Sequence, residues 1–183
     1  MPSIPETEPM AADLDPRVAL LLDKMACTEL VHRLARGIDR CDADLVRAVF
    51  HPDATDDHGM YQGTAADFVP WVMEVLAGMR RTQHMIGNVL IEVDGDKAQG
   101  EAYFIAHHHI PGESGDTFMV AAGRYLDRFE RRDGTWKMSH RHAVYDWSTA
   151  QASTDMWDRA AMPGYAFGER GHADPSYNHF NGA

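Results

Sequence analysis

Four long segments of strand-like sequence dominate the second half of the chain, and they constrain its fold more than any other feature. They cover residues 82–93, 97–110, 118–131 and 135–148. In the first of them, Val89, Ile91 and Val93 alternate with other side chains, as in a half-buried strand. Asp-Gly-Asp at 94–96 and Arg-Asp-Gly at 132–134 are typical of tight hairpin turns. The segments therefore predict a long antiparallel meander.

Three stretches with a helical pattern come before these strands. Pro16 suits the first turn of a helix whose apolar residues recur on one side, as far as Ile38. A second, short helix is predicted over residues 42–50, because the His-Pro pair that follows disfavours helical backbone. Thr64 can cap a third helix, which ends in two arginines. Residues 53–63, between the last two helices, are predicted to form a short strand.

Helices followed by a meander predict an α+β fold. We expect three N-terminal helices packed on one face of a curved mixed or antiparallel sheet, closed into a cone-shaped α+β barrel that encloses a cavity. The length of 183 residues suits one domain. We place this domain at residues 17–149, after a flexible arm at 1–16. Residues 150–183 are too aromatic for a solvated tail, and are predicted to cover the cavity or a neighbouring subunit.

The formal net charge of −11 argues against nucleic acid and anionic membrane surfaces as partners. The two cysteines, Cys27 and Cys41, show no metal-like spacing and are read as reduced thiols. The first residues lack the basic start and apolar core of a signal peptide. These features predict a cytoplasmic protein that acts on a small molecule.

Two residues are candidates for acid–base chemistry. His84 begins the first strand, where a cavity could use it as a general base. Asp39 lies near the end of the first helix, where the helix dipole disfavours a negative charge. Because this position gives the carboxylate little stability, another explanation is needed, and a His–Asp pair supplies one: the carboxylate would orient the imidazole and stabilise its charged form.

Strand phase predicts which side chains share the cavity, since alternate residues face the same side. On the fourth strand Arg141 shares a face with Tyr145 and Trp147, and it could stabilise an anion. On the second strand His107 and His109 share a face with Tyr103. The residues predicted to bind substrate are His58, Tyr61, Tyr103, His107, His109, Tyr145 and Trp147.

The run His107-His108-His109 also suggests a metal site. Neighbouring strand residues face opposite sides, so only His107 and His109 could bind one ion together, and nothing in the spacing requires a further ligand. We therefore predict no metal, and leave open which of the three histidines faces the cavity. The chain has no Gly-rich phosphate loop and no Gly-x-Ser-x-Gly nucleophile motif.

Three motifs in order resemble the SnoaL-like family, which has the nuclear-transport-factor-2-like cone fold. They are Arg-Gly-Ile-Asp-Arg at 36–40, Thr-Gln-His-Met-Ile-Gly-Asn at 82–88, and Glu-Arg-Arg-Asp-Gly-Thr-Trp-Lys-Met-Ser-His-Arg at 130–141. The family includes hexachlorocyclohexane dehydrochlorinase, scytalone dehydratase and bile acid 7α-dehydratase. The resemblance covers roughly residues 17–149.

The resemblance implies roles for individual residues. Asp39 and His84 match the aspartate and the base histidine of the dehydrochlorinase, and Arg141 matches its anion-stabilising arginine. Five residues before the aspartate, those enzymes have a lysine or a tyrosine, whereas this chain has Leu34. The dehydratases also use a His or Asp on the second strand, which favours a catalytic or substrate-binding role for the histidine run.

The resemblance thus predicts a cofactor-free lyase that acts on a small hydroxylated, aromatic or polycyclic substrate. The elimination would be a dehydration, or a retro-aldol-type loss of formaldehyde from a diaryl diol. The alternatives are a ketone isomerase of the same fold and a non-catalytic protein that binds a small molecule. The family also implies a homo-oligomer, a trimer or a dimer.

Overall fold

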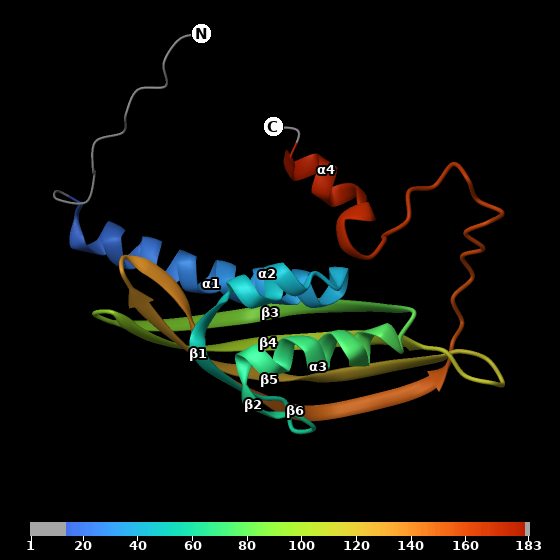
Figure 1. Cartoon of the computed structure of the whole chain (residues 1–183), viewed down its shortest axis with the longest axis horizontal. Coiled ribbons are helices and arrows are strands. Elements are labelled where there is room, and N and C mark those ends of the chain that lie inside the picture. The colour runs from blue at the N-terminus through green and yellow to red at the C-terminus, as the bar shows by residue number, and fades with distance from the viewer. Residues whose placement is uncertain (1–13, 182–183) are drawn as a thin grey trace, which may run out of the picture.

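The computed structural model describes residues 14–181, in which helices cover one face of a six-stranded sheet (Figure 1). The predicted α+β class is confirmed, whereas the cone shape stays a prediction. The elements are α1 (Pro16–Arg40), α2 (Ala43–Ala48), β1 (Phe50–Asp57), β2 (Gln62–Thr64), α3 (Ala65–Ala77), β3 (Arg81–Asp94), β4 (Lys97–Ile110), β5 (Thr117–Arg132), β6 (Thr135–Ala152), the 3-10 turn η2 (Gly171–Ala173) and α4 (Pro175–Asn181). Most of the predicted N-terminal arm lies outside the described residues, and its last residue, Pro16, begins α1.

The sheet is mixed, with the strand order β2-β1-β6-β5-β4-β3. The meander of β3, β4, β5 and β6 is antiparallel, as predicted. Strand β1 runs parallel to β6 and antiparallel to β2. The predicted bounds of this region were wrong, because α2 ends at Ala48 and β1 already begins at Phe50. Residues before a proline favour extended backbone, and Pro52 lies near the start of this strand.

Helix α1 places Asp39 at one end of β3. Asp15 caps its first turn by accepting from the backbone N–H of Arg17. Its last residue is followed by Cys41, whose φ of 51° is in the left-handed region that commonly ends a helix. Asp39 therefore lies in the last turn of α1.

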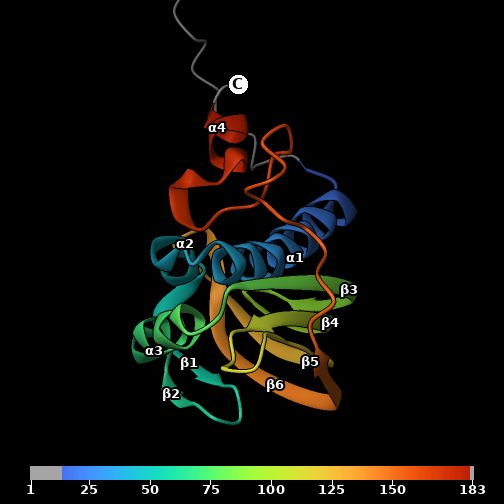
Figure 2. The ribbon, with the colours of Figure 1, turned by 90° about the vertical axis from the view of Figure 1, so that its right-hand side faces the viewer.

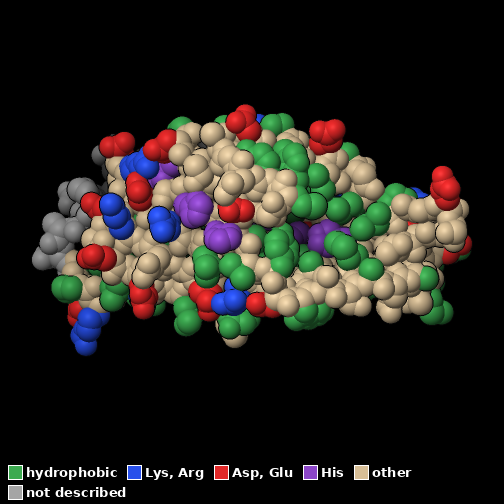
Figure 3. Space-filling view, turned by 90° about the horizontal axis from the view of Figure 1, so that it is seen from below, with side chains coloured by type: hydrophobic (Ala, Val, Ile, Leu, Met, Phe, Trp, Pro, Cys, Tyr) green, Lys and Arg blue, Asp and Glu red, His purple; other side chains and the backbone are tan. Residues whose placement is uncertain are grey.

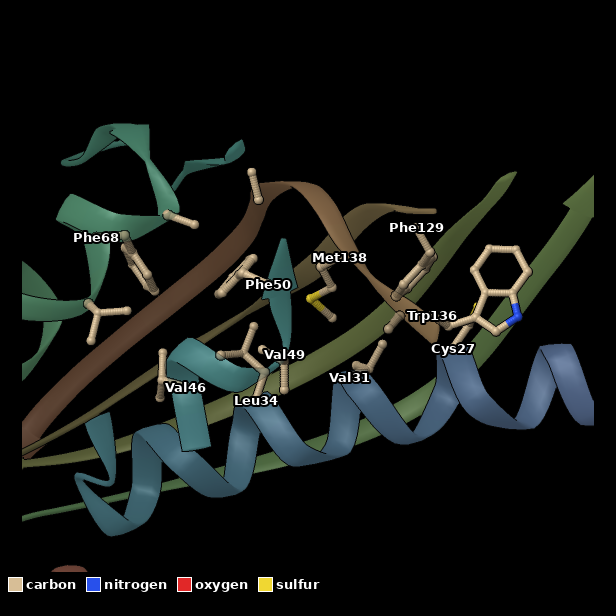
Figure 4. Close-up of a cluster of buried hydrophobic side chains, with 14 of the residues drawn as sticks. Cys27, Val31, Leu34, Val46, Val49, Phe50, Phe68, Phe129, Trp136 and Met138 are labelled. Carbon is tan, nitrogen blue, oxygen red and sulfur yellow. The ribbon is translucent and has the colours of Figure 1, made fainter. Parts of the chain in front are cut away.

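The main core fills the space between the helices and the sheet over part of its length (Figure 4). Cys27, Val31 and Leu34 of α1 lie there against Phe129 and Met138 of the sheet. A second, smaller cluster holds four buried side chains, Phe104, Ala106, Tyr125 and Ala143. Helices and sheet also line a hollow, whose walls include residues of both clusters such as Leu34 and Phe104.

The chain after β6 returns toward the helices (Figure 2). Strand β6 is longer than predicted and ends at Ala152. The tail then binds the end of α1 and the start of α2. Arg40 forms an ion pair with Asp174 at 2.7 Å, and Tyr177 donates its hydroxyl to Asp42 at 2.5 Å. The tail also supplies α4, a helix that was not predicted. No helix in the described part of the chain is long and apolar enough to cross a membrane.

Candidate active site

Two hollows meet at His84, which lines both of them. The first, here named the chamber, has a volume of about 420 Å³ and mostly apolar walls. Its lining includes Leu34, Phe68, Trp71, Leu76, Phe104, Tyr125, Tyr145 and three histidines, His58, His84 and His108. The second, here named the basin, has a volume of about 1200 Å³ and lies between α1, the start of β3 and the tail. Seen from below the view of Figure 1, the surface carries a group of hydrophobic side chains with histidine side chains among them (Figure 3).

The predicted pair of His84 and Asp39 is brought together. Nδ1 of His84 lies 2.7 Å from Oδ1 of Asp39, and the backbone N–H of His84 donates to Oδ2 at 2.8 Å. Both side chains are almost fully buried. The two bonds fix the ring in orientation, and they leave Nε2 as the nitrogen that can exchange a proton with a ligand.

The charge of Asp39 is held by this contact. Burial raises the pKa of its carboxyl, but the hydrogen bonds and charge of His84 outweigh burial, so the pKa lies below its ordinary value. An ionised carboxylate on Nδ1 makes Nε2 of His84 the better base.

His108 is the histidine of the run that faces the chamber. Its ring stands edge-on to that of His84, with the ring centroids 6.0 Å apart. Burial, and then the charge of His84, lower the pKa of His108 to about 4. Its Nδ1 is buried, with no hydrogen-bond partner among the described residues. His108 therefore stays neutral near neutral pH and leaves a polar atom for a ligand.

The predicted phase of β4 was wrong. Phe104, Ala106 and His108 face the chamber, while Tyr103 is largely exposed on the other face of the sheet. His107 and His109 line the basin instead, where Nε2 of His109 lies 2.5 Å from the hydroxyl of Ser153. Three histidines in a row show no alternation, so they do not indicate which of them faces inward. The phase was therefore set by Tyr103, whose aromatic ring suggested a cavity wall.

Arg141 lies in the wall of the chamber, and two of its nitrogens already donate hydrogen bonds to a carboxylate. It is 2% exposed and donates to both carboxylate oxygens of Asp127, at 2.8 and 2.7 Å. Its guanidinium carbon lies 3.8 Å from the centre of the Tyr125 ring. Such a bidentate, stacked arginine is held rigidly. The role predicted for Arg141, to stabilise an anion of the substrate, stays a prediction.

The other predicted binding residues differ in position. His58 and Tyr145 line the chamber, with the Tyr145 hydroxyl at 3.5 Å from the carbonyl of His58. Tyr61 does not: its hydroxyl donates to the carbonyl of Thr64 at 2.6 Å, and its ring packs on the core. Trp147 is 54% exposed and lines neither hollow. Tyr61 and Trp147 were thus wrongly placed in the cavity.

Several site residues were not predicted. Asp56 and Asp127 are both almost completely buried beside Arg141, and Tyr125 and Trp71 form walls of the chamber. Partners on other strands leave no signal in a single sequence. Among the residues that the structure describes, no group of three His, Cys, Asp or Glu side chains is placed to hold a metal ion.

Fold and site together define a small α+β protein with a histidine–aspartate dyad in an apolar chamber. The sequence profile of the SnoaL-like domain matches residues 19–142, so the chain belongs to the SnoaL-like family. An uncharacterized protein of Mycobacterium tuberculosis H37Rv, Rv2910c, is 27% identical over 127 residues, which is 68% of this chain and 86% of that protein.

Solved structures share the fold. The hexachlorocyclohexane dehydrochlorinase LinA-type3 of Novosphingobium barchaimii LL02 aligns with a TM-score of 0.66 and 23% identity, over 77% of this chain and 98% of that one. A candidate scytalone dehydratase of Novosphingobium aromaticivorans DSM 12444 aligns with a TM-score of 0.65 and 19% identity, over 76% and 97%. At these identities the likeness shows the fold, and the chemistry must be argued from the residues of this chain.

The buried pair of Asp127 and Arg141 gives a stability prediction. Replacing Asp127→Asn leaves the guanidinium buried without its bidentate partner, and should lower the free energy of unfolding by about 3 kcal/mol. Asp146→Asn is a matched control, because Asp146 pairs with Arg124 at the surface; its loss should stay under about 1 kcal/mol. Urea unfolding of both variants measures the difference, and equal losses would contradict the role given to the buried pair.

The low pKa of His108 predicts a pH dependence of stability. Since the folded pKa of about 4 lies below the ordinary value of 6.5, the unfolded chain binds a proton first as pH falls. Stability should therefore decrease below about pH 6.5 and level off near pH 4, by on the order of 2 kcal/mol between about pH 7 and pH 5. His108→Gln should lack this part of the decrease. Urea midpoints at both pH values test it, and an unchanged decrease in the variant would disprove the assignment.

Proposed function

We propose that this protein is a lyase that uses no cofactor and that removes a proton from its substrate with His84. The observation that carries the proposal is the 2.7 Å contact between Nδ1 of His84 and Asp39 at the junction of the chamber and the basin. Family membership and the dehydrochlorinase and dehydratase neighbours support elimination chemistry.

The first step is proton transfer to Nε2 of His84. Asp39 remains ionised and stabilises the imidazolium that forms. The neutral state of His108 matters here, because a charged ring beside His84 would oppose protonation of the base. The electron pair left on the substrate then expels a group from the neighbouring carbon, which is a hydroxyl in a dehydration. In the retro-aldol variant the base removes a hydroxyl proton, and the oxygen's electron pair forms the C=O bond of formaldehyde as the carbon–carbon bond breaks. The electron pair of that bond stays on the neighbouring carbon, which takes the proton back from His84.

The chamber indicates the class of substrate. Its volume of about 420 Å³ is in the range of small-molecule sites, and aromatic and aliphatic side chains form most of its walls. Such walls favour an aromatic or polycyclic body, whereas the hydroxyl that reacts would lie near the histidines. Assembly into a dimer or trimer stays a prediction.

Removing the imidazole of His84 should abolish most turnover. This can be tested with a general probe of base catalysis, without knowing the natural substrate. Nitrobenzisoxazole opens when a base removes its ring C–H proton and the N–O bond breaks, which yields a coloured nitrophenolate. His84→Ala should lower kcat/KM for this reaction by about 10²-fold or more. His142→Ala is a matched control, because His142 is exposed on β6, and it should retain activity. Equal rates in His84→Ala and the unchanged protein would refute the role of His84 as the base.

The natural reaction type can be read from product mass. The protein is incubated with aromatic β-hydroxy ketones and diaryl diols, and we expect a product lighter by water or by formaldehyde that is absent with His84→Ala. An isomerase would leave the mass unchanged but introduce deuterium from heavy water. A protein that only binds would do neither, and either of these outcomes would reject the lyase.

A further inference from the structure

The chamber contains a second histidine–aspartate pair besides the one already described. Nδ1 of His58 lies 2.5 Å from Oδ1 of Asp56. The ring of His58 is stacked on Phe68, with centroids 4.9 Å apart, and lies 6.0 Å from the ring of Tyr125. His58 comes directly after β1, so this pair approaches the chamber from β1, while Asp39 and His84 approach it from α1 and β3.

Asp56 belongs to a row of charges across three strands. In cross-strand register, Arg141 on β6 stands between Asp56 on β1 and Asp127 on β5. All three are nearly completely buried, at 1% or 2% exposure. The row thus contains two carboxylates and one guanidinium, and the guanidinium donates two hydrogen bonds to Asp127. With both carboxylates ionised, the row would carry one more negative charge than positive, which a buried site needs to have balanced.

His58 can supply the balancing positive charge. Oδ2 of Asp56 is buried and has no hydrogen-bond partner within residues 14–181. Asp39 differs, because a backbone N–H donates to its second oxygen. An imidazolium at His58 would balance the charge of an ionised Asp56, because the 2.5 Å contact places Nδ1 directly on its carboxylate. In that form Nδ1–H donates to Asp56, and Nε2–H remains as a proton donor. The titratable groups in contact with His58 are Asp56, Tyr125 and Tyr145. Arg141 and Asp127 lie next to Asp56 along the row.

We propose that His58, held by Asp56, is a second catalytic residue that donates a proton to the leaving group while His84 removes one from the substrate. Asp56 and Arg141 act as positioning residues. This proposal rests on the proposed lyase function, and it deepens it by naming the acid that a poor leaving group, such as hydroxide, requires.

The proton and electron changes balance. In a dehydration, Nε2 of His84 takes a proton from carbon, the C–H electron pair forms the double bond, and the C–O bond breaks. Nε2–H of His58 gives its proton to the departing oxygen, which leaves as water. His84 is then protonated and His58 neutral. Before the next turnover His84, which lines the basin, must lose its proton to solvent and His58 must regain one.

The protonation state of His58 is tested first, because it requires no substrate. In the full-length protein labelled with ¹⁵N, two-bond correlations near neutral pH should show both ring nitrogens of His58 protonated. His58→Gln assigns the signals, and Asp56→Asn should shift His58 to the neutral ring. A neutral His58 in the unchanged protein would overturn the proposal.

The catalytic part is tested by the leaving-group dependence of the benzisoxazole reaction. The nitro group stabilises the departing oxygen, so unsubstituted benzisoxazole relies more on an acid. His58→Gln should therefore raise the ratio of kcat/KM for the nitro compound to that for the unsubstituted compound by roughly 10-fold. His142→Gln is the control and should keep the ratio of the unchanged protein. An unchanged ratio in His58→Gln overturns the role as acid.

The two proposals fail in different ways. If the unchanged protein is no faster than His84→Ala with either compound, the lyase proposal fails, and with it the acid role of His58, whatever the NMR result. If His84→Ala is slow but His58→Gln keeps the ratio, the lyase stands and His58 is only a wall of the chamber.

Discussion

The candidate site depends on one contact between a helix and an edge strand. The carboxylate of Asp39 accepts from both the backbone N–H and the ring of His84. A single side chain thereby fixes the end of α1 to the start of β3 and also fixes the histidine rotamer. The contact is almost fully buried, so its hydrogen bonds compete little with water. The same carboxylate therefore both attaches helix α1 to strand β3 and orients the ring of His84.

The same sheet carries the main core at one end and the candidate site at the other. Where Phe129 and Met138 meet Leu34 and Val31, helix and sheet are in close contact and the core is dry. Toward the other end, helix and sheet line the chamber, whose inner strand positions hold Ala106 and Ala121 beside larger residues such as Phe104 and Tyr125. The polar atoms of the chamber are few, and each one affects the charge of its neighbours.

Residues with local signals were predictable from the sequence, and residues defined by distant partners were not. Asp39 and His84 could be paired because one lies at an unfavourable helix end and the other at a strand start. The phase of β4 was misjudged, although Glu101 at an outward position and Ala102 at an inward one could have set it. The row around Arg141 depends on which strands are neighbours, and the parallel pairing of β1 with β6 brings together residues 85 positions apart. No short-range pattern contains that information.

The two histidine–aspartate pairs illustrate how similar contacts differ through their surroundings. Both rings bind a carboxylate through Nδ1, at 2.7 Å for His84 and 2.5 Å for His58. For His84 the carboxylate has a backbone donor, and the neighbouring His108 is neutral, so its ring can begin as a base. For His58 the carboxylate lies in a buried row with a second carboxylate and one guanidinium, and in the proposed mechanism its ring would begin as an acid. The division of labour would follow from what binds the second oxygen of each aspartate, not from the histidines themselves.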